Sequence, residues 1–247
     1  KTENKVEIAP RNYKLNFSDF VGIGKNGNLW VEDCDVEELV KKYGSPLLII
    51  SESQFRQSFR QFKKAFTDNY KGEVEILYAN KSNNSLALRH IMNQEGGGGD
   101  CFGVNEMYIS LLAGTNPKML VLNGSNKQDE ELEMAIANGL CINIDSMDEL
   151  GRISEISKKF NKSVDIGIRL ALDLDPLAEK TGVSMHGPGT LKEQSDSTKW
   201  GMTREQTVEI VNNAQKLKNI HLKETHFHLS RMTNEVEPFA VMAREMI

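Results

Sequence analysis

The sequence contains the stretch Ile76-Leu77-Tyr78-Ala79-Asn80-Lys81-Ser82-Asn83-Asn84, in which an apolar run ends in a polar turn. The apolar part has the composition of a short buried strand, and the turn that follows it carries Lys81. A lysine in such a turn can react with an aldehyde once its amine loses its proton. Two interpretations of Lys81 therefore stand side by side, an imine-forming lysine and an ordinary surface charge.

The composition is that of an ordinary globular protein. Of 247 residues, 39% are hydrophobic and 26% are charged, which is enough apolar material for a sizeable core. The formal net charge is -5, and Lys and Arg are spread along the chain rather than clustered. This is not the charge pattern of a polyphosphate-binding protein, so we expect no nucleic-acid partner.

The three cysteines, Cys34, Cys101 and Cys141, lack CxxC spacing and an accompanying histidine cluster. Neither a metal site nor a disulfide framework is predicted from this usage. The chain has no apolar stretch of roughly 20 residues, and residues 1–5 lack the apolar core of a signal peptide. We therefore expect a cytoplasmic protein with no membrane segment.

From about residue 74, apolar strand-like runs alternate with helical patterns. Strict alternation of this kind predicts parallel strands joined by helices. Ser146 and Thr203 each open a capping-box sequence, which predicts a helix start. The expected strands are 74–79, 100–104, 119–122, 141–144, 164–170 and 221–227, and the expected helices are 84–94, 105–113, 128–138, 146–159 and 203–217.

This order fits either an open doubly wound sheet or a (β/α)8 barrel. Residues 80–83 lack the glycine-rich fingerprint of a dinucleotide-binding sheet, which counts against the open sheet. The four glycines at 96–99 are not followed by Gly-Lys-[Ser/Thr], so we interpret them as a flexible connector. Six βα units are present, about two fewer than a barrel needs.

The residues before this alternation show a different pattern. Residues 21–31 predict a hairpin around Asn26-Gly27, where the glycine supplies the positive φ of a tight turn. Asp35 is expected to cap a helix that Gly44-Ser45-Pro46 ends. Residues 47–50 are expected to form a short strand.

Several polar residues fall at or near the expected strand ends. In a barrel the carboxyl ends of the strands share one mouth, and active sites lie there. The non-periodic residues 172–198 are interpreted either as a cover for such a site or as a disordered insertion. The candidates for the mouth are Lys81, Asp100, Glu106, Asn123, Asp145, Arg169 and His228.

Tyr78-Ala79-Asn80-Lys81-Ser82-Asn83 resembles the Tyr-Ala-x-Lys-[Ala/Cys/Ser]-Asn motif of the fold type III, or alanine-racemase-fold, pyridoxal-phosphate enzymes in their diaminopimelate and ornithine decarboxylase branch. Further stretches are similar to this branch in the same order, over residues 20–245. They are Tyr43-Gly44-Ser45-Pro46-Leu47, Gly99 to Glu106, Asn123 to Lys127, Asp145-Ser146, Arg169, Thr181-Gly182, Lys199-Trp200-Gly201 and His226-Phe227-His228.

The resemblance implies an α/β fold with a TIM-type (β/α)8 barrel, which is incomplete in this chain. It also implies that pyridoxal 5'-phosphate forms an imine with Lys81. Lys81 and His228 would be catalytic, with Lys81 returning a proton and His228 lying against the cofactor ring. Tyr78, Asp100 and Arg169 complete the implied contacts with the cofactor at this end.

Asp100, Glu106 and Arg169 would tune the pKa and the orientation of Lys81. Residues of this kind also occur as purely structural buried ion networks, and both interpretations remain open here.

The chain departs from the branch after the histidine, where x-Gly-Ser is usual and Leu229-Ser230-Arg231 stands instead. Ser230 and Arg231 are therefore the candidates for binding the cofactor phosphate, and Arg231 could also bind a substrate carboxylate. Gly103 replaces a serine of the branch.

The later phosphate loop and the C-terminal β domain of the branch do not appear before Ile247. We expect residues 1–50 to be an N-terminal arm, a β segment of a second β domain and a linking helix. Residues 51–247 would be part of the barrel that binds pyridoxal phosphate, in a chain that lacks its C-terminal part.

The implied activity is pyridoxal-phosphate-dependent decarboxylation of a basic or dibasic amino acid by a homodimer. An amino-acid racemase of the same fold is an alternative, although the residues that usually follow its lysine are absent. A relative that binds the cofactor or a partner without turnover is the alternative from another class, suggested by Leu229-Ser230-Arg231.

Overall fold

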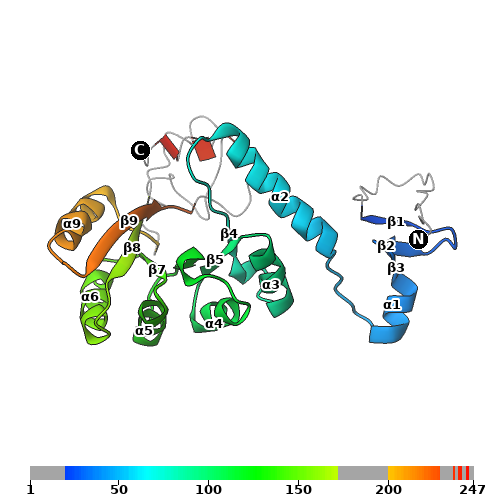
Figure 1. The fold of residues 1–247 in the computed structure, drawn as a ribbon, viewed down its shortest axis with the longest axis horizontal. Coiled ribbons are helices and arrows are strands. Elements are labelled where there is room, and N and C mark those ends of the chain that lie inside the picture. The colour runs from blue at the N-terminus through cyan, green and yellow to red at the C-terminus, as the bar shows by residue number, and fades with distance from the viewer. Residues whose placement is uncertain (1–19, 172–199, 229–235, 237–238, 241–242, 245–247) are drawn as a thin grey trace, which may run out of the picture. The chain divides into compact units, whose positions relative to one another are not determined.

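The computed structural model describes residues 20–171, 200–228, 236, 239–240 and 243–244. The chain divides into two compact units, Lys1–Val74 and Glu75–Ile247. Each unit has its own sheet (Figure 1). The expected domain boundary at residue 50 stays a prediction.

The described part of the first unit begins with a small antiparallel sheet of β1 (Val21–Ile23), β2 (Leu29–Val31) and β3 (Cys34–Asp35). Gly27 has a φ of 83° in the turn between β1 and β2, so the predicted hairpin is confirmed. Helix α1 (Val36–Tyr43) follows. The Asp35 side chain accepts from the Glu37 backbone N–H, and Gly44 ends the helix, as predicted.

Two features of this unit differ from the prediction. Residues 47–50 form no strand, and Leu48 is 97% exposed. An apolar run becomes a strand only when a neighbouring strand pairs with it. Helix α2 (Glu52–Asn69) was not predicted. Ser51 caps it by accepting from the Gln54 backbone N–H at 3.0 Å, and the phenylalanines at 55, 59, 62 and 66 have helical spacing.

The second unit contains six parallel strands that pair in sequence order (Figure 1). A doubly wound sheet reverses its strand order at a switch point, whereas this order contains no reversal, as in a barrel. The α/β fold with an incomplete barrel is therefore confirmed. The strands are β4 (Leu77–Ala79), β5 (Gly98–Cys101), β6 (Leu120–Leu122), β7 (Cys141–Ile144), β8 (Val164–Arg169) and β9 (Ile220–His226).

The helices of this unit lie along one face of the sheet (Figure 1). Alternate strand residues such as Leu122, Ile142 and Ile166 are buried against them in one apolar core. We call the opposite face the inner face, because in a barrel it lines the interior. The helices are α3 (Leu86–Gln94), α4 (Val104–Leu112), α5 (Asp129–Asn138), α6 (Glu149–Lys159) and α9 (Arg204–Ala214).

The pairing of β8 with β9 contains a bulge. Ile166 pairs with Leu222, but the next residue, Gly167, pairs with Glu224, so Lys223 is an extra residue in β9. An extra residue reverses the alternation of side chains beyond it. Glu224 and His226 therefore lie on the inner face.

The interpretation of residues 96–99 as a flexible connector is wrong for the last two glycines. Gly98 and Gly99 are buried residues of β5. Gly98 needs its missing side chain, because a Cβ there would lie 2.1 Å from the Met119 carbonyl oxygen. β5 therefore begins two residues earlier than predicted, and Asp100 lies near its carboxyl end.

Substituting Gly98→Ala should lower the free energy of unfolding by about 1–3 kcal/mol, because the new methyl group must push β5 and β6 apart. Urea unfolding of the full-length protein measures this loss. Gly151→Ala in α6 is the matched control, since its Cβ meets no atom within 4 Å. A helical alanine in open space should instead stabilise the protein by about 0.5–1 kcal/mol.

Of the two predicted capping boxes, one is confirmed. Thr203 and Gln206 cap α9 reciprocally. The box at Ser146 is wrong, because α6 begins three residues later, at Glu149. In a capping box at Ser146, the Glu149 carboxylate would accept from the backbone N–H of Ser146. It accepts instead from the backbone N–H of Asp145, at 3.0 Å.

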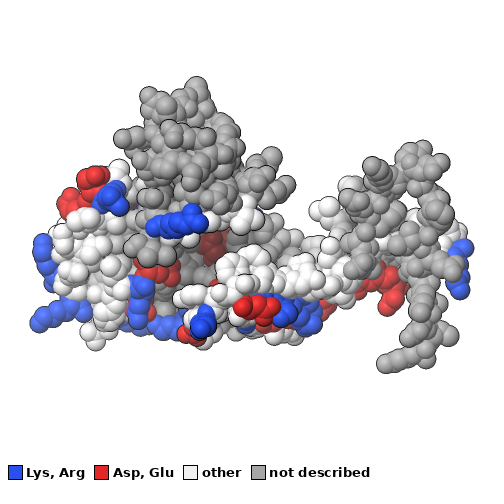
Figure 2. Space-filling view, turned by 90° about the horizontal axis from the view of Figure 1, so that it is seen from above, with Lys and Arg blue, Asp and Glu red and all other residues white. Residues whose placement is uncertain are grey.

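The described surface carries both signs of charge. Figure 2 shows basic and acidic side chains interspersed on the described part of the face that it presents. Among the described residues, no helix is long and apolar enough to cross a membrane.

Candidate active site

The carboxyl ends of the six parallel strands bring most of the predicted residues to one edge of the sheet. Lys81 follows β4, Asp100 lies in β5, and Arg169 is the last residue of β8. Asn123 and Asp145 directly follow β6 and β7. This edge is the mouth of the barrel, where the fold places active sites.

Lys81 lies in a single 3-10 turn, Asn80–Ser82, and its side chain is exposed. Its Nζ lies 4.1 Å from the centroid of the Phe102 ring, a cation-π distance. Asn80 is fully buried behind it and donates to the Ser110 hydroxyl at 2.8 Å. The turn is thus fixed from behind while the amine stays accessible.

Asp100 is held by amide groups of the neighbouring strands. Asn123 Nδ2 donates to Asp100 Oδ1, and Asn143 Nδ2 donates to Asn123 Oδ1 at 2.9 Å. Burial raises the pKa of Asp100 above its usual value, and the hydrogen bond from Asn123 and the charges of Lys81 and Arg169 offset only part of this rise. Asp100 is thus electrostatically coupled to Lys81 and Arg169, which fits both a tuning role and a structural ion network, so both interpretations stay predictions.

Arg169 is buried and paired with Asp145. Its Nη1 lies 3.2 Å from Asp145 Oδ1, and the same oxygen accepts from the Gly201 backbone N–H at 3.2 Å. The Arg169 guanidinium also lies 5.8 Å from the Trp200 ring centroid. These contacts hold the guanidinium in one orientation at the mouth.

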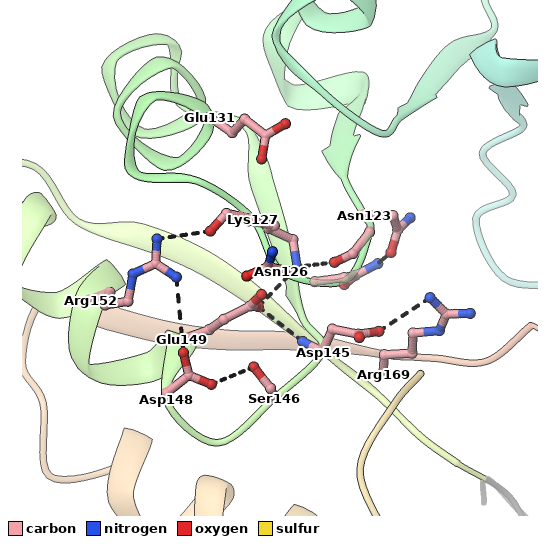
Figure 3. A network of polar contacts seen from close by, with 12 residues as sticks. Asn123, Asn126, Lys127, Glu131, Asp145, Ser146, Asp148, Glu149, Arg152 and Arg169 are labelled. Atoms are coloured by element: carbon pink, nitrogen blue, oxygen red, sulfur yellow. Dashed lines mark hydrogen bonds and ion pairs between the residues drawn. The ribbon is translucent and has the colours of Figure 1, made fainter. Parts of the chain in front are cut away.

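A second buried ion pair lies behind Asp145 (Figure 3). Lys127 Nζ donates to Glu149 Oε2 at 2.9 Å, and both side chains are 1% exposed. Lys127 also donates to the Gly124 carbonyl at 2.7 Å. Together with the bond from the Asp145 N–H to Glu149, the pair fixes the loops after β6 and β7. The sequence analysis did not predict this pair, although Lys127 ends one of its quoted motifs and Glu149 is the fourth residue of the capping-box sequence that it expected at Ser146.

Glu106 points back toward the preceding loop. Its carboxylate accepts from the Phe102 backbone N–H at 2.8 Å, which fixes the residue whose ring lies beneath Lys81. Burial raises the pKa of Glu106, and the Phe102 hydrogen bond lowers it.

Of the three site residues predicted at 228–231, the structure describes only His228. His228 lies two residues beyond β9 and is exposed. Ser230 and Arg231 lie outside the described residues, as does the loop predicted at 172–198, so their roles stay predictions.

Tyr78 lies on the helix-facing side of β4, away from the mouth. Its partner in β5 is Gly99, and its ring centroid lies 5.7 Å from the guanidinium of buried Arg89. A role for Tyr78 in cofactor binding therefore stays a prediction.

His226 was assigned no role from the sequence, yet it lies beside Arg169 at the same edge of the sheet. It is the last residue of β9 and pairs with Arg169 in the sheet, and its buried Nδ1 has no hydrogen-bond partner among the described residues. Burial, with smaller contributions from the charges of Arg169, His228, Lys81 and Lys127, lowers the pKa of His226 to about 4. His226 is therefore a neutral imidazole at neutral pH.

This depressed pKa predicts a pH dependence of stability. Between pH 6.5 and about 4 the unfolded chain takes up a proton on His226 and the folded protein does not, so stability falls as the pH falls. Relative to His226→Asn, the wild type should lose about 1–3 kcal/mol over this range. Urea unfolding of the full-length proteins at a series of pH values measures the difference. A gap that does not change with pH would contradict it.

A parallel sheet in sequence order, with an accessible lysine, a carboxylate, a guanidinium and a neutral imidazole at its carboxyl edge, defines a barrel domain with a lysine-centred site. Residues 52–247 match the family described as pyridoxal-dependent decarboxylase, pyridoxal binding domain. The chain belongs to this family, which confirms the branch that the sequence resembled.

Diaminopimelate decarboxylase of Archaeoglobus fulgidus is 33% identical over 215 residues, which are 87% of this chain and 48% of the relative. Diaminopimelate decarboxylase of Methanothermobacter thermautotrophicus is 34% identical over 157 residues, 64% of this chain and 35% of the relative. The crystal structure of diaminopimelate decarboxylase from Methanocaldococcus jannaschii in complex with L-lysine matches with a TM-score of 0.83 and 26% identity, covering 92% of this chain and 52% of that chain. The chain spans about half or less of the length of these relatives.

Proposed function

We propose that the full-length protein decarboxylates a basic or dibasic amino acid, as a diaminopimelate decarboxylase does, with pyridoxal 5'-phosphate attached to Lys81. The observation that carries this proposal is the exposed side chain of Lys81 at the mouth of the parallel sheet. Residues 52–247, which include this sheet, match the pyridoxal-binding domain of the pyridoxal-dependent decarboxylases. Relatives named diaminopimelate decarboxylase support the choice of substrate class.

The residues at the mouth fit such a cofactor chemically. An aldehyde needs a primary amine, and Lys81 offers one that is accessible. The buried Nδ1 of His226 has no partner within the described residues and is free to meet a polar group of a ligand. Arg169 provides a fixed guanidinium, which suits a carboxylate or a phosphate.

When bound, pyridoxal phosphate supplies the electron sink for the carbanion that remains as CO2 leaves. Lys81 would hold the cofactor through Nζ, and its amine would supply the proton that replaces CO2. Asp100, held by Asn123, is proposed to orient the Lys81 amine through the electrostatic interaction between the two side chains. His228 is proposed to lie against the cofactor ring, and Ser230 or Arg231 to bind its phosphate.

Borohydride reduction of the full-length protein with the cofactor tests the attachment. The reduced linkage should be found by peptide mapping on Lys81, and a label on another lysine would reject the assignment. Release of CO2 from diaminopimelate, lysine or ornithine tests the reaction. Loss of optical rotation without CO2 would indicate a racemase instead, and attachment without either reaction would indicate a non-catalytic relative.

A homodimer and a cytoplasmic location remain proposals that follow from the resemblance and the composition. Light scattering of the full-length protein tests the first of them.

A further inference from the structure

A chain of polar side chains crosses the inner face of the sheet below the mouth. The interior of a (β/α)8 barrel is usually filled by bulky branched apolar residues. Here Asp100 of β5, Asn123 after β6, Asn143 of β7 and Glu224 of β9 occupy inner-face positions instead. Asp100, Asn123 and Asn143 are already joined by two hydrogen bonds.

The direction of these hydrogen bonds fixes the amides. An ionised Asp100 only accepts, so Asn123 must turn its NH2 group toward it, and Asn123 Oδ1 then accepts from Asn143 Nδ2. The remaining polar atom, Asn143 Oδ1, can only accept. It is buried and has no hydrogen-bond partner among the described residues.

Glu224 lies beside this oxygen. A Cβ on Gly167 would lie 1.7 Å from Asn143 Oδ1 and 2.7 Å from Glu224 Cγ, so both groups fill the space that the glycine leaves open. An ionised carboxylate at this place would present a second acceptor to Asn143 Oδ1. A protonated carboxyl group presents an O–H donor.

We propose that Glu224 carries a proton, donates it in a hydrogen bond to Asn143 Oδ1, and thereby positions the Asp100 carboxylate through the two asparagine amides. Glu224 is thus a positioning residue for the group beside Lys81. Its effect on catalysis rests on the proposed function, whereas the location of the proton does not.

The chain also permits the opposite arrangement, with the proton on Asp100 and both amides reversed. The surrounding charges favour the proposed one. Lys81 and Arg169 stabilise an ionised Asp100. The pKa of Glu224 is raised on balance, because burial and the negative charges of Glu75 and Asp100 outweigh the opposing effect of a hydrogen bond with the Asn143 side chain.

The Glu224 side chain is exposed to solvent, whereas Asn143 Oδ1 is buried. Because water does not reach this oxygen, it needs a hydrogen-bond donor from the protein, and Glu224 lies beside it. Other titratable groups near Glu224 on the inner face are Cys141 of β7, Asp165 and Arg169 of β8, and His221 and His226 of its own strand.

Glu224→Gln tests the location of the proton, because the glutamine Nε2 can donate to Asn143 Oδ1 at every pH. A carboxyl group whose pKa is raised on folding contributes stability at low pH that is lost as the pH rises through the folded-state pKa. In urea unfolding from pH 4.5 to 8, the wild type should therefore lose stability relative to Glu224→Gln as the pH rises. Each unit of pKa difference changes the folding equilibrium constant about tenfold.

The control is Glu155→Gln on α6, which removes one negative charge from an exposed position and should follow the wild type at each pH. A gap between the wild type and Glu224→Gln that stays constant with pH would show that Glu224 does not carry the proton and would overturn the proposal.

A second measurement addresses positioning. Glu224→Leu cannot donate, so kcat for CO2 release should fall about tenfold or more with little change in KM, while Glu224→Gln keeps kcat and loses the decline of the wild type at high pH. Unchanged kcat and pH profile in Glu224→Leu would overturn the positioning role. If no substrate is decarboxylated, the proposed function fails, and the unfolding experiment still decides where the proton is.

Discussion

Replacing Lys81 with alanine is expected to lower kcat for CO2 release by about 10³-fold or more, because the variant loses both the group that holds the cofactor and the group that moves a proton. The free energy of unfolding should change by less than about 0.5 kcal/mol, since the side chain is exposed. Steady-state kinetics of the full-length protein with excess cofactor, together with urea unfolding, measure the two quantities.

Lys81→Arg separates the chemistry of the amine from its charge. Arginine keeps the positive charge above Phe102 but cannot lose a proton, so it should be as inactive as alanine. Lys158→Ala, on the exposed surface of α6, controls for the removal of a lysine. If Lys81→Arg keeps a tenth or more of the wild-type rate, Lys81 acts as a charge and the proposed attachment is wrong.

The largest effect on stability is expected at the buried pair of Lys127 and Glu149 (Figure 3). Glu149→Gln leaves the ammonium group of Lys127 in the interior without its counter-charge. Removing one partner of a buried pair costs about 3–5 kcal/mol, and urea unfolding of the full-length protein measures this loss.

Two further variants show whether burial is the cause. The double variant Lys127→Met, Glu149→Leu removes both charges and should cost less than Glu149→Gln, about 1–3 kcal/mol, because the Asp145 N–H and the Gly124 carbonyl still lose a partner. Lys159 and Glu133 form a shorter pair, at 2.6 Å, but both are exposed. Glu133→Gln should cost less than about 1 kcal/mol, and a cost equal to that of Glu149→Gln would contradict the argument from burial.

Most strands and helices of the second unit could be predicted from the sequence, because their apolar residues recur at the regular spacing of a strand or a helix. Ile142 and Ile144, for example, alternate with polar neighbours and are buried as this pattern requires. The same reasoning failed at residues 47–50, because whether an apolar run becomes a strand depends on a partner that local sequence does not reveal.

Within the site, the residues that follow strand ends could be predicted from topology alone. Lys81, Asp100 and Arg169 lie at one edge because parallel strands share their carboxyl ends. The contacts between distant residues could not be predicted. The pairing of Lys127 with Glu149, and of Asn143 with Asn123, depends on which side chains meet in space once the strands have paired and the connecting loops have folded. His226 was passed over because its position depends on the bulge in β9.

That bulge has a consequence for insertions and deletions. A chain one residue shorter at Lys223 would lose only the extra residue, so the strand would run straight and still pair His226 with Arg169. A strand that kept Lys223 but ran without the bulge would instead pair Thr225 with Arg169, and it would exchange its inner and outer faces without the substitution of any residue.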